Sequence, residues 1–282
     1  MPRSRADSEL ATGQRLGPYR LLALLGQGQM GVIFRARRDT DGESVALKIL
    51  RGELAEDDLY RRRFQREGRI ASELAHPHIV PVVDYGEASG WLYLAARYVQ
   101  GLSLAELISS RGQLPLTKTL RLARHVSAGL DALHDRNLVH RDVKPANVMV
   151  DESGTAALTD FGLARGEADT VLTRAGAVVG TVDYLAPELI RGRPATRSSD
   201  IYAFGCLVYE CLAGAAPFSG KQFAETLLAH VREEPRVLSA HRADLPQSVS
   251  WAVVKALAKE PAERPPTATA YARLLRASAE AG

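Results

Sequence analysis

The octapeptide HRDVKPAN, residues 140–147, places an acid, two basic side chains and a carboxamide in a stretch too short and too Pro-broken to be a helix. In such a loop Asp142 could accept a hydroxyl proton, Lys144 could neutralise a phosphoryl oxygen, and Asn147 could offer its carbonyl oxygen to Mg²⁺. Mg²⁺ favours one or two hard protein ligands together with substrate phosphates. The stretch therefore favours a catalytic loop for phosphoryl transfer over a polar turn between two strands.

Length and charge limit the class of protein. At 282 residues the chain is long enough for two lobes that share a ligand cleft, and this is the arrangement we expect. The net charge of +3 is the small difference between 36 basic and 33 acidic side chains. This balance argues against a nucleic-acid surface and against a polybasic membrane anchor.

Targeting signals are absent from the sequence pattern. Residues 1–15 lack the apolar core of a signal peptide, and no later apolar run approaches the roughly 20 residues of a membrane helix. Cys206 and Cys211 lie in one apolar segment that we expect to be helical, about 7.5 Å apart along its axis and so beyond disulfide reach. We expect a cytoplasmic protein with two core thiols.

The glycines of residues 25–31 (LGQGQMG) join two β-rich runs, Tyr19–Leu25 and Val32–Arg37. A dinucleotide-binding fingerprint would need a helix after the last glycine, but here a second strand opens. A Walker A loop is excluded because no Gly-Lys-Ser/Thr follows. The sequence therefore predicts a glycine-rich β-hairpin.

A third strand, Ser44–Leu50, carries Lys48 among β-forming residues. The charged run Asp57–Leu74 has mostly helical apolar spacing and would present either Glu67 or Glu73 towards whatever lies beneath it. Two more β runs, residues 79–85 and 91–98, precede a break at Val99–Gly101, where we place a hinge.

After the hinge the pattern becomes helical. A helix over residues 117–135 leads into the octapeptide, and a short hairpin, with strands at residues 148–150 and 156–158, brings Asp160 close to Asn147. Residues 163–186 have no sustained period and should form a long functional loop. Further helices are predicted at Ser199–Ala213, Gln222–Arg232, Ser248–Ala258 and Thr267–Arg276.

Five motifs occur together in one order: GxGxxG at residues 26–31, VALK at 45–48, the octapeptide, DFG at 160–162 and APE at 186–188. With these motifs, the chain from about Tyr19 to about Arg276 resembles a eukaryotic-like (Hanks-type) serine/threonine protein kinase. The residues of its motifs are most similar to those of bacterial members. The resemblance implies an α+β, two-lobed fold, with a small antiparallel-sheet N-lobe containing one main helix and a larger, mainly helical C-lobe.

The implied domain boundaries are a flexible tail at 1–16, a kinase domain at 17–276 and a C-terminal tail at 277–282. Within the kinase domain we expect the N-lobe at 17–98, the hinge at about 97–101 and the C-lobe at 102–276.

The resemblance also implies roles for individual residues. Lys48 would pair with the α- and β-phosphates of ATP and also with Glu67, because Glu73 lies too close to the helix end. Asp142 would orient the hydroxyl and accept its proton, while Asn147 and Asp160 would hold Mg²⁺ or Mn²⁺. The nucleotide-binding residues would be Leu25, Gly26, Gln27, Gly28, Gln29, Met30, Gly31, Ile33, Ala46, Lys48, Ala96, Arg97, Val99 and Met149.

Substrate and control residues follow from the same resemblance. Lys144 and Thr181 are typical of members that act on serine or threonine. Arg141 would pair with a phosphorylated activation-loop residue, with Thr173 as the first choice and Thr170 as the second.

Three further residues have implied structural roles. Asp200 would brace the catalytic loop, although it could equally be a helix N-cap. Glu188 and Arg264 would form an ion pair.

Two alternative functions to that of a protein kinase remain at this point. A pseudokinase scaffold would share the fold without transfer activity, but the catalytic set, Lys48, Asp142, Asn147 and Asp160, is complete. A small-molecule kinase is the second alternative, and the segment Thr181–Glu188, which resembles a peptide-docking segment, argues against it. The expected partners are proteins with Ser/Thr acceptors and a second copy during autophosphorylation, with no nucleic acid and no membrane span.

Overall fold

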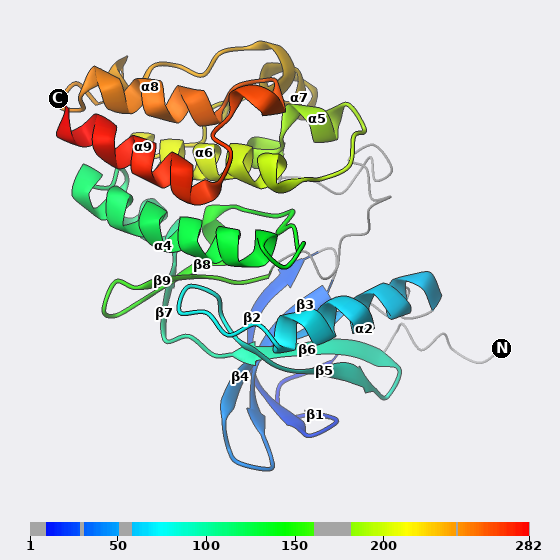
Figure 1. Cartoon of the computed structure of the whole chain (residues 1–282). Coiled ribbons are helices and arrows are strands. Elements are labelled where there is room, and N and C mark those ends of the chain that lie inside the picture. Colours follow the sequence, from blue (N-terminus) through cyan, green and yellow to red (C-terminus); the bar gives the residue numbers. More distant parts are fainter. Residues whose placement is uncertain (1–9, 29–30, 51–57, 161–181, 241, 282) are drawn as a thin grey trace. The chain divides into compact units, whose positions relative to one another are not determined.

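The computed structural model of the chain describes residues 10–28, 31–50, 58–160, 182–240 and 242–281. The chain divides into two compact units, Met1–Val99 and Gln100–Gly282. Figure 1 shows strands and one long helix in the first unit, and mainly helices in the second. Within the described ranges, none of the helices combines the length and the apolar character needed to cross a membrane.

The first unit is built on an antiparallel sheet with the strand order β1-β2-β3-β4-β6-β5. Its strands are β1 (Arg15–Leu16), β2 (Tyr19–Gly28), β3 (Gly31–Arg38), β4 (Ser44–Leu50), β5 (Val82–Ala88) and β6 (Trp91–Arg97), and its helix is α2 (Asp58–Ser72). In β4 every second residue, Val45, Leu47 and Ile49, enters the core because side chains alternate between the faces of a strand.

The N-terminal residues depart from the sequence prediction. Residues 1–16 were expected to form a flexible tail, but Arg15–Leu16 pair with β2, and Leu16 is only 1% exposed. The backbone N–H of Gly13 also donates to Leu21 O, at 2.8 Å. The expected tail was therefore too long, because the burial of one leucine draws this segment into the core.

The second unit contains a small antiparallel sheet in the order β7-β8-β9. Its strands are β7 (Gly101–Ser103), β8 (Val148–Asp151) and β9 (Ala156–Leu158). Its helices are α3 (Leu104–Arg111), α4 (Leu116–His134), α5 (Pro187–Ile190), α6 (Arg197–Ala213), α7 (Phe223–Arg232), α8 (Gln247–Ala256) and α9 (Ala268–Glu280).

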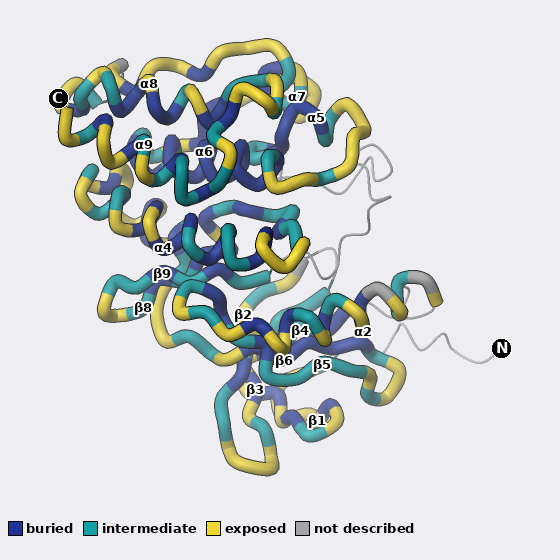
Figure 2. The backbone as a smooth tube through the Cα atoms, viewed as in Figure 1, coloured by how far each residue is buried: buried dark blue, intermediate teal, exposed yellow. Residues whose placement is uncertain are grey.

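Helix α6 is the centre of the second unit. It is buried along almost its whole length and appears dark blue in Figure 2, with Tyr202 and Phe204 fully covered. The apolar face predicted for α4 is also buried, including Leu122, Val126 and Leu130. Helix α6, which is apolar on most sides, is thus a core element rather than a surface element.

Helix α9 is longer than predicted. Its start is capped by Thr267, whose hydroxyl accepts from Ala270 N at 3.0 Å, and by both carboxylate oxygens of Asp131 in α4. It then continues to Glu280, beyond the expected end at Arg276, and the Arg276–Glu280 pair at 2.8 Å supports the added turn. The residues expected to begin the C-terminal tail are thus largely helical.

Candidate active site

The catalytic-loop residues converge on one carboxylate oxygen. Lys144 Nζ lies 2.8 Å from Asp142 Oδ2, and Asn147 Nδ2 donates to the same oxygen at 3.0 Å and to the Asp142 carbonyl at 2.8 Å. A short 3₁₀ turn over Pro145–Asn147 returns the amide to the aspartate. The sequence placed these three side chains in one loop, and the turn brings them into contact.

The loop backbone is held from the core by Asp200. Its Oδ2 accepts from His140 N at 2.8 Å and its Oδ1 from Arg141 N at 2.9 Å. Arg141 has φ +65°, a left-handed conformation that is unfavourable for a residue with a Cβ. Two hydrogen bonds to a charged acceptor can hold such a conformation.

Asp200 does not cap helix α6, because Thr196 is the N-cap residue. The sequence left two roles open for Asp200. Its hydrogen bonds to His140 N and Arg141 N are those of the loop brace.

Asn147 and Asp160 are brought together by the predicted hairpin. Val148 pairs with Leu158, and Thr159 N donates to Asn147 O at 3.0 Å, so Asp160 follows directly beside Asn147. Because the amide nitrogen of Asn147 faces Asp142, its carbonyl oxygen points to the other side. A carboxylate and an amide oxygen at one hairpin end are hard ligands that suit Mg²⁺ or Mn²⁺.

The glycine-rich segment is a hairpin, as predicted, with Gly28 paired with Gly31. A Cβ added to Gly31 would lie 1.9 Å from Ile49 O, so this glycine is required by the neighbouring strand β4. A Cβ at Gly26 would meet nothing within 4 Å. The close approach of β4 therefore explains the glycine at position 31 but not the one at position 26.

Lys48 occupies a row of side chains across the sheet. It lies opposite Ile33 on β3 and opposite Leu94 on β6, and directly opposed residues share a face. Ala46 lies opposite Ala96 in the same way. The residues expected to contact the phosphates and the base therefore share one face of this sheet, because their spacing along β4 is two residues.

The remaining predicted site residues are distributed over both units. Leu25, Gln27 and Arg97 are exposed, while Glu67 on α2, Val99 and Met149 are half-buried. Arg97 N donates to Pro81 O at 2.9 Å, so any contact of the Arg97 backbone with an adenine would use its carbonyl oxygen. Gln29, Met30, Thr170, Thr173 and Thr181 lie outside the described residues.

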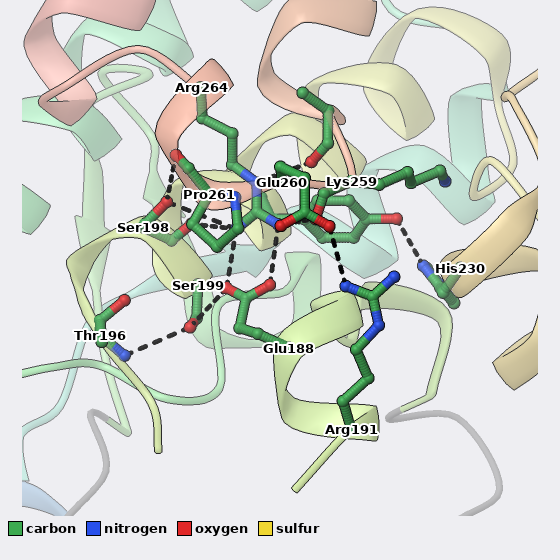
Figure 3. Close-up of polar contacts among 12 residues, drawn as sticks. Glu188, Arg191, Thr196, Ser198, Ser199, His230, Lys259, Glu260, Pro261 and Arg264 are labelled. Atoms are coloured by element: carbon green, nitrogen blue, oxygen red, sulfur yellow. Dashed lines mark hydrogen bonds and ion pairs between the residues drawn. The ribbon is translucent and has the colours of Figure 1, made fainter. Parts of the chain in front are cut away.

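Figure 3 shows the buried pair of Glu188 and Arg264. Arg264 Nη1 and Nη2 approach the two carboxylate oxygens at 2.7 and 2.8 Å, and both side chains are almost fully covered. Burial by itself raises the pKa of Glu188, but the hydrogen bonds and charge of Arg264 outweigh it, and the pKa lies below its ordinary value. Ser199 Oγ donates a further bond to Glu188, at 2.8 Å.

Sequence reasoning missed two contacts that only folding creates. His134 Nε2 lies 2.8 Å from Asp200 Oδ2, which ties the end of α4 to the loop brace. Tyr184 OH donates to Glu210 Oε2 at 2.5 Å, and burial raises the pKa of both groups. The partners are 66 and 26 residues apart in the chain, so no local pattern could have paired them.

An antiparallel sheet with one long helix, followed by a mainly helical unit that carries a braced catalytic loop, defines the protein kinase fold. The solved PknI kinase domain of Mycobacterium tuberculosis has the same fold, with a TM-score of 0.78 at 32% identity, over 96% of this chain and 100% of that one. The family model for the protein kinase domain matches residues 19–273.

Curated relatives narrow the comparison. The serine/threonine-protein kinase PknD of M. tuberculosis is 38% identical over 260 residues, and PrkC of Bacillus subtilis is 38% identical over 257. These matches cover 92% and 91% of this chain but only 39% and 40% of the relatives. The chain belongs to the protein kinase family, and its resemblance to bacterial Hanks-type members is confirmed.

Proposed function

We propose that the chain is an ATP-dependent serine/threonine protein kinase, which transfers the γ-phosphate of Mg-ATP to Ser or Thr hydroxyls of proteins, including its own activation loop. The observation that carries this proposal is the convergence of Lys144 and Asn147 on the Asp142 carboxylate. A base, a cation and an amide in contact are the groups that phosphoryl transfer to a hydroxyl uses.

Each side chain has a separate task in this reaction. Asp142 orients the acceptor hydroxyl and takes its proton as the new O–P bond forms. Lys144, 2.8 Å from Asp142 Oδ2, offers positive charge to the transferred phosphoryl group. The hydrogen bonds from Asn147 keep Asp142 in one orientation, so positioning and electrostatics supply most of the rate.

Nucleotide and metal are held by further residues of the chain. Asn147 and Asp160 would bind Mg²⁺, which neutralises phosphate charge when bound. Lys48, on the rigid strand β4, would contact the α- and β-phosphates, with Glu67 of α2 orienting its ammonium group. The backbone of the β2–β3 hairpin would donate N–H groups to phosphate oxygens.

The preference for serine or threonine acceptors rests on the resemblance of Lys144 and Thr181 to residues of family members that act on these hydroxyls. We place the activity in the cytoplasm, because ATP is available there and because the two cysteines, Cys206 and Cys211, are free buried thiols. The partners would be protein substrates and, during autophosphorylation, a second copy of the chain.

Replacement of Asp142 by asparagine tests the proposal. Asp142→Asn removes the base, and Lys48→Met removes the phosphate contact, so each should lower transfer from Mg-ATP to casein or to the chain itself by at least about 10²-fold. Asp135→Asn, at an exposed position at the end of α4, is the matched control and should keep full activity. Circular dichroism checks that every variant folds.

Retention of more than about a tenth of wild-type transfer by Asp142→Asn would contradict the assigned base, because general-base catalysis contributes 10² or more. Binding of ATP without transfer by the wild-type chain would instead indicate a pseudokinase scaffold.

A further inference from the structure

Helix α2 contains a glycine in its interior, directly after Glu67. Gly68 is buried, and glycine in a helix interior is less stable than alanine, so its presence calls for a packing reason. A Cβ added to Gly68 would lie 2.7 Å from both Cγ and Cδ2 of Tyr85, and 3.3 Å from its Cβ. These atoms belong to the base of the ring and cannot swing away as the tip of a flexible side chain would.

Tyr85 stands in the same row as Lys48. On β5 it lies opposite Leu94 of β6, and Leu94 lies opposite Lys48 of β4. The three side chains therefore share the sheet face on which α2 packs beside β5 (Figure 1). With strands about 4.8 Å apart, Tyr85 lies about 10 Å from Lys48. Its ring packs directly against Gly68, the residue that follows Glu67.

Strand β5 is fixed on its other face, so the tyrosine cannot easily retreat. The neighbouring Asp84 accepts hydrogen bonds through Oδ2 from Tyr19 OH at 2.7 Å and from Tyr93 OH at 3.0 Å. Both tyrosines lie in the hydrophobic core of the sheet. A group added at Gly68 would therefore move α2 rather than β5.

We propose that the contact between Gly68 and Tyr85 is a spacer that sets the height of α2 above the sheet and so positions Glu67 for Lys48. Both are positioning residues, and the proposal rests on the roles of Lys48 and Glu67 in the proposed function. Ordinary carbon–carbon contact requires about 3.5–4.0 Å, so a methyl group at Gly68 displaces the helix by roughly 1 Å. A displacement of that size can cost about 10²-fold in rate.

The test is a double-mutant cycle of Gly68→Ala and Tyr85→Ala. Gly68→Ala alone should lower kcat by about 10- to 100-fold with the KM for the protein substrate unchanged, because the displaced Glu67 acts on Lys48 and the phosphates rather than on the acceptor. In the Tyr85→Ala background the same change should cost less than about threefold, because the ring is gone. Gln65→Ala, on the exposed side of α2, is the control for helix propensity and should leave kcat unchanged.

Thermal unfolding of the same four proteins tests the contact without any activity. Gly68→Ala should lower the Tm when Tyr85 is present and raise it when Tyr85 is replaced, because only helix propensity then remains. A Tm change of the same sign in both backgrounds would overturn the spacer, as would wild-type kcat in the Gly68→Ala variant. An inactive wild type with the sign reversal intact would instead contradict the proposed function.

Discussion

Replacing Arg264 by methionine removes a guanidinium group that has no exposed surface. The Arg264 side chain donates to both oxygens of Glu188 and to the backbone carbonyls of Ala258, Ser198 and Lys259, at 2.7–3.2 Å. Methionine keeps much of the packing volume but donates nothing. Glu188 is left with the bond from Ser199 as its described side-chain contact.

The expected cost follows from these lost contacts. Removal of one partner of a buried ion pair costs roughly 3–5 kcal/mol, because the other charge stays in the interior without compensation. We therefore expect Arg264→Met to lower the free energy of unfolding by about 3–5 kcal/mol. This is a large part of the 5–15 kcal/mol that is typical of a whole domain.

Urea unfolding followed by circular dichroism at pH 7 measures this change. The matched control is Arg191→Met, which breaks the neighbouring pair of Arg191 with Glu260 at 3.2 Å (Figure 3). Because 57% of the Glu260 side chain is exposed, the control should lose less than about 1 kcal/mol. Equal losses in the two variants, or a loss below about 1 kcal/mol for Arg264→Met, would refute the reasoning.

The pH dependence of this stability difference provides an independent test of the ion pair. In the wild type the pKa of Glu188 lies below 4.5, so its stabilising contribution is present above that pH and is lost as the pH falls through the folded-state pKa. Without Arg264, burial remains the largest influence on the pKa of Glu188 and raises it, so protonation relieves the buried charge. The difference between wild type and Arg264→Met should therefore shrink as the pH falls from 7 towards about 4.5.

Three further predictions concern activity. Asp200→Ala leaves the N–H groups of His140 and Arg141 without their shared acceptor and should lower kcat about 10- to 100-fold at saturating ATP; unchanged kcat would contradict the brace. Ala96, 8% exposed and opposite Ala46 and Val82, offers only a methyl group at the position that, by resemblance to the family, walls the back of the adenine pocket. Bulky pyrazolopyrimidine inhibitors should therefore block the wild type, and Ala96→Met should restore resistance while keeping ATP use; equal inhibition of both forms argues against an open cavity. A phosphate of charge about −1.5 to −2 on Thr173 or Thr170 should pair with Arg141, so mass spectrometry of the active chain should find one of them modified, and full activity of the unmodified Thr170→Ala/Thr173→Ala variant would exclude this control.

The sequence by itself determined the elements whose information is local. The octapeptide, the glycine hairpin and the alternation around Lys48 each occupy a short stretch, in which period, turn residues and chemistry agree. Most of the predicted helices and strands lie close to their observed positions for the same reason, but β5 lies three residues later than the run predicted at 79–85, and β7 was not predicted. Further errors fall at the chain ends. There the burial of Leu16 and the capping of α9 by Asp131 depend on residues distant in the sequence.

Only the tertiary structure determines which partners Asp200, Gly31 and Gly68 contact. Asp200 could have been an N-cap, but folding places it beneath the catalytic loop, and His134 joins it there. Gly31 and Gly68 are both glycines beside functional residues, yet one is required by Ile49 O and the other by the ring of Tyr85. Periodicity predicts which face a side chain occupies, whereas close contacts arise only when elements pack at van der Waals distance, and no single stretch of sequence contains both sides of such a contact.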